Sequence, residues 1–171
     1  MPDWLAAFVQ ENLALKILGI DVGLNGALAL IDSDGALIEI NDMPTLKDGP
    51  KGRKTVSAAL LANIVYRSGA TMAFVEMVNA RPGEGAVGAF SFGRSRGVIE
   101  GCLAACGLPC RFIAPAVWKR AAGIPPGNAK DASRSEAIRR WPSMAAMFAR
   151  AKDDGRAESA LIGWAGMRKG F

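Results

Sequence analysis

The feature that most constrains this chain is a carboxylate placed between two hydrophobic runs, in residues 16–32, KILGIDVGLNGALALID. The runs 16–22 and 26–32 flank a short turn, and this pattern predicts an antiparallel pair of strands. Asp21 lies near the end of the first run, where an ionised side chain is costly to bury unless its charge is compensated. Asp21 is therefore either a turn residue before Gly23 or part of a site that contains other charged groups.

The rest of the hydrophobic pattern predicts a single mixed α/β domain. A chain of 171 residues is long enough for one hydrophobic core and too short for two comfortable ones. After a DSDG turn, residues 36–42 continue the strands as a meander, and a helix between the later strands makes those two parallel. We expect strands at 71–78 and 109–115, helices at 55–69, 90–107, 116–123, 131–142 and 157–169, and polar loops at 43–54 and 79–89. Thr55 is the expected N-cap of the first helix, and Gly69 its end.

Composition removes several kinds of chemistry. The chain has no histidine, which excludes Ser-His-Asp and Cys-His catalysis and most transition-metal sites. Its three cysteines include no pair of CxxC motifs, which argues against zinc, and their odd number fits a reducing cytoplasm. The net charge of +5 favours an anionic partner. Catalysis here would have to use carboxylates, lysines, hydroxyls and bound hard cations.

Residues 1–15 are predicted to form a helical extension of the domain at residues 16–171. The N-terminal segment carries Asp3 and Glu11 and lacks a basic region, so it is a poor signal peptide and is better interpreted as a short amphipathic helix. No hydrophobic run approaches the roughly 18–20 residues that span a bilayer, so no membrane association is expected.

Acidic residues distant in the sequence are predicted to meet at one edge of the sheet. Asp21 ends the first strand and Glu76 lies near the end of the fourth, so both leave the same edge if the strands are neighbours. A late helix begins near Asp153 and Asp154, and Glu158 lies one turn after Asp154 on the same face. Clustered carboxylates repel one another, and a pair of oxygen-ligated divalent cations is the simplest compensation. Two such ions stabilise both oxygens of a phosphodiester displacement.

Each of these carboxylates also has an ordinary structural interpretation. Glu76 alone fits an ion pair with an arginine. Asp153 or Asp154 fits a helix N-cap, and Glu158 fits a solvated position on the helix. Only the joint placement of these residues at strand ends and helix starts favours a functional site.

Four blocks of the sequence resemble the RuvC-type Holliday junction resolvases, most of all the variants found in phages and prophages. The blocks are GIDVGLNGALALID, FVEMVNARPGEGAVGAFSFGRSRGVIEG, APAVWKRAAGIPPGNAKDASRSEAIRRWP and KDDGRAESALIGWAG. The resemblance, in the order and spacing of all four blocks, covers the chain from about Lys16 to Gly166. The resemblance implies a ribonuclease H-like fold and a homodimer that cuts four-way DNA junctions. It also implies two Mg²⁺ ions (or Mn²⁺) in each active site and the cytoplasm of a bacterium or an infected host cell.

The resemblance assigns roles to the same carboxylates. Asp21 takes the place of the first-strand aspartate, Glu76 that of the fourth-strand glutamate, and Glu158 that of the final helix carboxylate. Asp154 corresponds to the upstream ligand on that helix. Its spacing to Glu158 differs by one residue from that of the family, so Asp153 remains a rival for this role.

Basic and aromatic residues in the second and third blocks are predicted to contact DNA. Lys119 and Lys130 fall where the family carries two lysines near the scissile phosphate, and a cation there can stabilise charge that develops in the transition state. The predicted DNA contacts are Arg81, Phe90, Phe92, Arg94, Arg96, Lys119, Arg120, Lys130 and Arg134. Solvated surface lysines, a solubilising helix face and phenylalanines of the core are the alternatives.

A stripe of small residues, Gly93, Gly97 and Gly101, would let the predicted helix pack closely against the sheet or against a second subunit.

Two other functions are compatible with parts of the pattern. The DVGLNG segment also resembles the first phosphate loop of actin-like ATPases and sugar kinases, although no second phosphate loop is found and those chains are usually about twice as long. The other alternative is a protein that binds DNA junctions without cutting them. The acidic set argues against it, because carboxylates without a metal would weaken DNA binding.

Overall fold

The computed structural model describes residues 15–79, 83, 85–127 and 131–169. Its centre is a sheet of five strands in the order β3-β2-β1-β6-β7. Strands β1 and β2 pair antiparallel, as do β2 and β3, whereas β1 pairs parallel with β6 and β6 with β7. The expected mixed sheet, a three-strand meander followed by two parallel strands, is confirmed. The strands are β1 (Lys16–Ile20), β2 (Ala27–Asp32), β3 (Leu37–Asp42), β6 (Met72–Glu76) and β7 (Cys110–Ile113).

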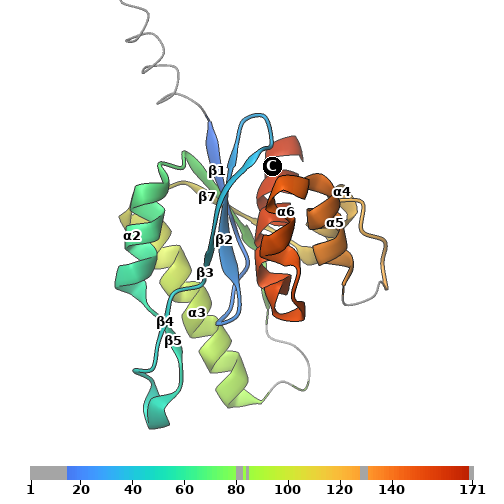
Figure 1. Cartoon of the computed structure of the whole chain (residues 1–171). Helices are drawn as coiled ribbons and strands as arrows, with labels where there is room; N and C mark the ends of the chain where they lie inside the picture. The colour runs from blue at the N-terminus through green and yellow to red at the C-terminus, as the bar shows by residue number, and fades with distance from the viewer. Residues whose placement is uncertain (1–14, 80–82, 84, 128–130, 170–171) are drawn as a thin grey trace, which may run out of the picture.

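Helices cover both faces of the sheet and form three layers (Figure 1). The helices on one face are α2 (Ala58–Ser68) and α3 (Ala86–Ala105). Those on the other are α4 (Pro115–Ala121), α5 (Ala132–Arg140) and α6 (Asp154–Lys169), with the short helices η2 (Pro142–Phe148) and η3 (Ala151–Asp153). Alternate residues of β1 supply the two cores: Ile17 packs on the α6 side, whereas Leu18 and Ile20 pack on the α2 and α3 side.

Glycines let α6 lie directly on the central strand. A Cβ atom added at Gly19 of β1 would overlap the backbone oxygen of Ser159 and would lie 2.5 Å from the backbone nitrogen of Gly163. One turn further along, a Cβ at Gly166 would overlap the ring of Phe74 in β6. Because the strand and the helix both lack side chains where they cross, the N-terminal end of α6 is held close to the carboxyl end of β1.

The segment before α2 differs from the sequence prediction. Thr55 is not the N-cap of a helix; it lies in β5 (Thr55–Val56), which pairs with β4 (Thr45–Leu46) as a small hairpin, with η1 (Pro50–Gly52) between them. The N-cap is Ser57, whose hydroxyl accepts a hydrogen bond from the backbone N–H of Leu60. The expected loop at 43–54 therefore contains most of a hairpin that lies beside the N-terminal half of α3 (Figure 1).

Helix α3 begins earlier than expected, at Ala86, inside the predicted loop 79–89. Its glycine stripe does not pack against the sheet, because a Cβ atom added at Gly93, Gly97 or Gly101 would meet no described atom within 4 Å. Helix α6 begins at Asp154, where the late helix that carries the acidic residues was expected to start.

One sequence prediction cannot be followed here. The predicted N-terminal helix falls almost wholly on residues 1–14, which lie outside the described residues. Among the helices that the structure describes, none is long and apolar enough to cross a membrane.

Candidate active site

The site is built around two adjacent strand ends. Strands β1 and β6 are parallel neighbours, and Ile20 pairs with Val75, so Asp21 and Glu76 follow at the same edge of the sheet. Their carboxyl groups are close enough to share a hydrogen bond. The expectation that the two side chains leave the sheet together is confirmed.

Helix α6 brings a third carboxylate to the same place. Glu158 lies one turn into the helix and is near enough to raise the pKa of Asp21. The approach depends on Gly155, where an added Cβ atom would overlap the backbone oxygen of Asn25 and would lie 3.1 Å from Oδ2 of Asp21. A side chain at this position would push the N-terminal end of α6 away from Asp21.

The electrostatics of Asp21 are those of a crowded acidic site. Burial raises the pKa of Asp21 well above its usual value, and the negative charges of Glu76 and Glu158 raise it further. Lys119 acts in the opposite direction but does not outweigh them. The protein alone therefore leaves this carboxyl group under-compensated, which is the condition that a bound cation would relieve.

Trp118 of α4 links the strand edge to a lysine. Its buried indole donates a hydrogen bond from Nε1 to Oε1 of Glu76 at 3.0 Å. The ammonium group of Lys119 lies 5.1 Å from the centre of the same ring. Lys119 also lies 3.6 Å from Oε1 of Glu158, which in addition accepts a hydrogen bond of 3.2 Å from the hydroxyl of Ser133. Helices α4, α5 and α6 thus each contribute to the position of one acidic group.

The two rival aspartates have different environments. Asp153 is buried, and its carboxylate accepts hydrogen bonds from the backbone and the guanidinium of Arg150 at the start of η3. Arg156 approaches it as well, at 3.6 Å. Asp154 is half-exposed and accepts a hydrogen bond of 2.8 Å from Nε of Arg134. Asp153 therefore closes a helix start, whereas Asp154 is the aspartate with an exposed carboxylate.

A broad cavity of about 1060 Å³ opens at this edge of the sheet. Four of the predicted acidic residues, Asp21, Asp153, Asp154 and Glu158, line it. The cavity is also lined by cations that the sequence prediction missed, Lys54, Arg150, Lys152 and Arg156. In the sequence, Lys54 stands out only as part of the basic GPKGRK run at residues 49–54. Its position beside the cavity depends on the β4–β5 hairpin, which the sequence did not predict.

The donor set fits a hard divalent cation. Asp21, Glu76 and Glu158 offer carboxylate oxygens alone, which suit Mg²⁺ or Mn²⁺ better than softer metals. Within the described residues, no three acidic or cysteine side chains are already arranged at metal-binding distances. Ion binding here would therefore need the carboxylate side chains to rearrange.

The predicted DNA contacts separate into two groups. Phe90 and Arg94 are exposed on α3, and Arg120 is exposed on α4. Phe92, in contrast, is half-buried against the core and lies near Gly23. Arg96 binds Glu100 and the backbone oxygen of Val78 and lies over the ring of Phe112, so it holds α3 to the sheet.

Other predicted contacts are either engaged or outside the structure. Arg134 pairs with Asp131 as well as Asp154, and its side chain is largely buried. Arg81 and Lys130 lie outside the described residues.

Comparison with known proteins supports the fold. The sequence matches no protein-family model and no curated protein. The structure is similar to that of Thermus thermophilus RuvC in complex with a Holliday junction substrate, with a TM-score of 0.60 and 15% identity over 91% of this chain and 96% of that chain. A second structure of Thermus thermophilus RuvC gives a TM-score of 0.57 and 16% identity over 91% and 97% of the two chains. The chain therefore has a RuvC-like fold, as the sequence resemblance implied.

Proposed function

We propose that this protein is a divalent-metal-dependent endonuclease that cleaves four-way (Holliday) junctions or other branched DNA. The observation that carries the proposal is the meeting of Asp21, Glu76 and Glu158 at the carboxyl ends of β1 and β6. The RuvC-like fold supports it, since one similar structure contains a Holliday junction substrate. The cations around the site cavity favour a polyanionic substrate.

The acidic residues would hold two ions, Mg²⁺ or Mn²⁺. Asp21, Glu76 and Glu158 are the central ligands in this proposal, and Asp154 is the fourth. Two such ions would supply activation of a water molecule and stabilisation of charge on the oxygens of a phosphodiester. The family resemblance implies that the products carry a 5′-phosphate and a 3′-hydroxyl. Asp153 is not included, because its carboxylate is buried and held by Arg150 and Arg156, whereas the carboxylate of Asp154 is half-exposed.

The remaining residues of the site would position groups and neutralise phosphate. Trp118 orients Glu76 through its indole N–H, and Ser133 orients Glu158. Lys119 lies beside Glu158 with its ammonium group partly exposed, where it can contact a phosphate oxygen. We assign the same role to Lys130 on the resemblance alone.

We further propose that the protein acts as a homodimer. A four-way junction offers two symmetry-related strands, and a two-fold dimer offers two active sites to them. The exposed glycine stripe of α3 is compatible with such a contact.

A labelled synthetic four-way junction tests the proposal against both alternatives. Wild type should introduce paired, symmetric nicks with Mg²⁺ and none in EDTA. Asp21→Asn should bind the junction without cutting it, whereas the control Asp34→Asn, in the exposed β2–β3 turn, should cut as wild type does. Equal cutting by wild type and Asp21→Asn would remove Asp21 from the mechanism. Binding without cutting by wild type would favour the binding-only protein, and ATP hydrolysis without nicking would favour the ATPase.

A further inference from the structure

Strand β3 also ends in a carboxylate at the edge of the sheet where the acidic site lies, and the sequence prediction missed it. The strand runs in the same direction as β1, because each pairs antiparallel with β2, and Asp42 is its last residue. Asp42 lines the same cavity as Asp21 and Glu158. Arg156 donates a hydrogen bond to each of its carboxylate oxygens, from Nε at 2.5 Å and from Nη2 at 2.7 Å.

This ion pair joins the edge strand to the first turn of α6. Only 18% of the Arg156 side chain is exposed, whereas 64% of the Asp42 side chain is exposed. The hydrogen bonds from the guanidinium hold the pKa of Asp42 below its ordinary value, so the pair is ionised at neutral pH. The remaining nitrogen of Arg156, Nη1, lies 3.6 Å from Oδ1 of Asp153, which Arg150 also binds. One guanidinium therefore connects β3, η3 and α6.

Arg156 lies on the opposite side of α6 from the acidic residues of the site. Asp154 and Glu158 are four residues apart and share one face of the helix. Because an α-helix turns by about 100° per residue, Arg156 is rotated by roughly 200° from each of them. Contacts from α4 and α5 hold the site face through Glu158, and Asp42 holds the opposite side. The first turn of α6 is thus held from both sides.

The end of β3 is a firm anchor for the helix because it is bonded to the turn between β1 and β2. The backbone N–H of Met43 donates a hydrogen bond of 2.9 Å to the backbone oxygen of Gly26 in this turn. The same turn touches α6, since a Cβ atom added at Gly155 would lie 3.0 Å from Cα of Gly26. Loss of the ion pair would therefore let the start of α6 shift relative to this turn, which directly follows Asp21.

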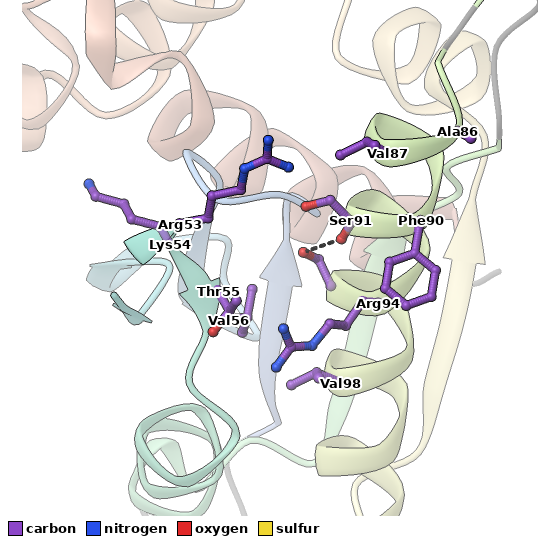
Figure 2. A pocket seen from close by; sticks show the side chains of 11 residues that line it. Arg53, Lys54, Thr55, Val56, Ala86, Val87, Phe90, Ser91, Arg94 and Val98 are labelled. Atoms are coloured by element: carbon purple, nitrogen blue, oxygen red, sulfur yellow. Dashed lines mark hydrogen bonds between the residues drawn. The ribbon is translucent and has the colours of Figure 1, made fainter. Parts of the chain in front are cut away.

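Arg156 differs from other cations near the site. Lys54 lines both the site cavity and the pocket between the β4–β5 hairpin and α3, which Arg53 and Arg94 also line (Figure 2). Within the described residues, no salt bridge joins these three side chains to an acidic group, whereas Arg156 binds both oxygens of Asp42. The hairpin cations are therefore suited to contacting phosphate, and Arg156 to holding the helix.

We propose that Arg156 is a positioning residue of the acidic site. Its ion pair with Asp42 sets the first turn of α6, and with it the carboxylates of Asp154 and Glu158, in the position that divalent cations require. This inference rests on the proposed function, since it takes the acidic residues as cation ligands. An ion pair with one exposed partner adds little to overall stability, whereas a small displacement of a ligand lowers metal affinity and rate. Loss of the pair should therefore act on the site more than on the fold.

Binding of Mn²⁺ to the DNA-free protein tests the inference without any cleavage, with the electron paramagnetic resonance signal of the free ion as the measurement. Arg156→Gln removes a positive charge and Asp42→Asn removes a negative one, so a purely electrostatic influence would change the affinity in opposite directions. A positioning pair requires both variants to bind Mn²⁺ more weakly, by about tenfold to a hundredfold. Arg156→Lys keeps the charge but lacks the planar fork, so it should recover only part of the affinity.

The matched control is Arg139→Gln. Arg139 also donates to both oxygens of a carboxylate, that of Glu136, at 2.8 and 2.7 Å, but it is not among the residues that line the site cavity. This substitution makes the same change in net charge as Arg156→Gln, and it should leave the Mn²⁺ affinity unchanged.

Hydrogen exchange of the metal-free protein measures the position of the helix start directly. The backbone amides of residues 158–161 bond to the carbonyl groups of the first turn of α6. They should exchange faster in Arg156→Gln and Asp42→Asn than in wild type, and at the wild-type rate in Arg139→Gln. If Arg156→Gln does not fold, as judged by circular dichroism, Asp42→Asn and Arg156→Lys decide the result, because the lysine keeps the charge.

Failure of this inference is distinguishable from failure of the proposed function. Opposite shifts of Mn²⁺ affinity in Arg156→Gln and Asp42→Asn, or wild-type affinity in both, overturn the inference, while junction nicking that depends on Asp21 still stands on its own assay. An equal loss of affinity in Arg139→Gln, or unchanged exchange at residues 158–161 in every variant, overturns it as well. A wild type that neither binds Mn²⁺ nor nicks junctions overturns the proposed function, and this inference with it.

Discussion

Among single residues, Trp118 connects more parts of the site than any carboxylate does alone. Its indole N–H holds Glu76, its ring lies beneath Lys119, and the whole side chain is buried. The hydrogen bond holds one carboxylate oxygen of Glu76, and Asp21 lies beside the same carboxylate. The indole therefore restricts the orientation of Glu76 relative to Asp21. We therefore regard Trp118 as a positioning residue and not as a catalytic one.

Replacing Trp118 by Phe separates this role from packing. Trp118→Phe keeps an aromatic ring in the core but removes the N–H donor to Glu76, so we expect kcat for junction cleavage to fall by about tenfold to a hundredfold with little change in KM. Trp141→Phe is the matched control, because its indole N–H binds the backbone oxygen of Gly35 away from the site. It should lower thermal stability and leave kcat unchanged. Equal kcat for Trp118→Phe and wild type would contradict the positioning role.

The acidic residues show how far the sequence alone could predict the site. The meeting of Asp21 and Glu76 was predictable, because two parallel neighbouring strands place their carboxyl ends at one edge. The choice between Asp153 and Asp154 was not, because both lie at a helix start. Our preference for Asp154 depends on the burial of Asp153 and on its pairing with Arg150 and Arg156, which only the packed structure shows.

At the scale of elements, the crossing of α6 over β1 positions the acidic site. Helix and strand approach so closely at Gly19 and Gly163 that there is no room for a side chain between them. Because Asp21 follows β1 and Glu158 lies on α6, any displacement of the helix separates the two carboxylates.

Gly19→Ala tests this contact. The added methyl group would overlap the backbone oxygen of Ser159, which cannot move aside as a flexible side chain would, so we expect the free energy of unfolding to fall by about 1–3 kcal/mol. The measurement is denaturant-induced unfolding. Gly97→Ala is the control, because an added Cβ there meets no described atom and alanine favours the helix by about 1 kcal/mol. Equal effects of the two substitutions would contradict the close crossing.

A second contact between elements should depend on pH. Burial alone would raise the pKa of Glu136 in α5, but hydrogen bonds from Arg139 and Arg140 outweigh burial and hold this pKa below its ordinary value. Arg140 in turn lies 3.5 Å from the ring centre of Trp164 in α6. The ion pair between Glu136 and Arg140 therefore also helps to hold α5 against α6.

Glu136→Gln should lower the free energy of unfolding by about 1–2 kcal/mol at neutral pH. Because the folded-state pKa is depressed, the ion pair contributes its full stability above the unfolded pKa and loses it as the pH falls through the folded pKa. The difference between wild type and variant should therefore shrink in acid, as measured by unfolding at a series of pH values. A difference that stays constant down to pH 2 would assign the effect to packing.

The β4–β5 hairpin marks the limit of sequence prediction for elements. Its strands are two residues each, and KDGPKGRK between them carries no hydrophobic alternation. Thr55 precedes the helical pattern as an N-cap would, but its backbone pairs with Leu46 in the hairpin, and the capping position shifts to Ser57. Pairing between short strands is a tertiary outcome, and local propensity does not report it.

At the scale of the whole molecule, acidic groups at the base of the site are surrounded by cations from distant segments. Lys54 comes from the hairpin, Arg94 from α3, Lys119 from α4, and Lys152 from the approach to α6. This arrangement suits a polyanion whose phosphates contact the rim at several places while one of them lies over the carboxylates. Affinity for DNA should therefore fall steeply with salt.

Charge-removing substitutions on different faces of the molecule should change the salt dependence of DNA binding to different extents. A double variant, Arg53→Gln with Lys54→Gln, should reduce the slope of log affinity against log salt by about 2, because each lost phosphate contact removes roughly 0.9 for duplex DNA. The matched control removes the same charge from exposed positions on α2 and α6, Arg67→Gln with Lys169→Gln. Because both double variants have the same net charge, a long-range effect of total charge would change both slopes equally. Phosphate contact at the hairpin would change only the first, and junction binding by Asp21→Asn protein over a salt series distinguishes the two outcomes.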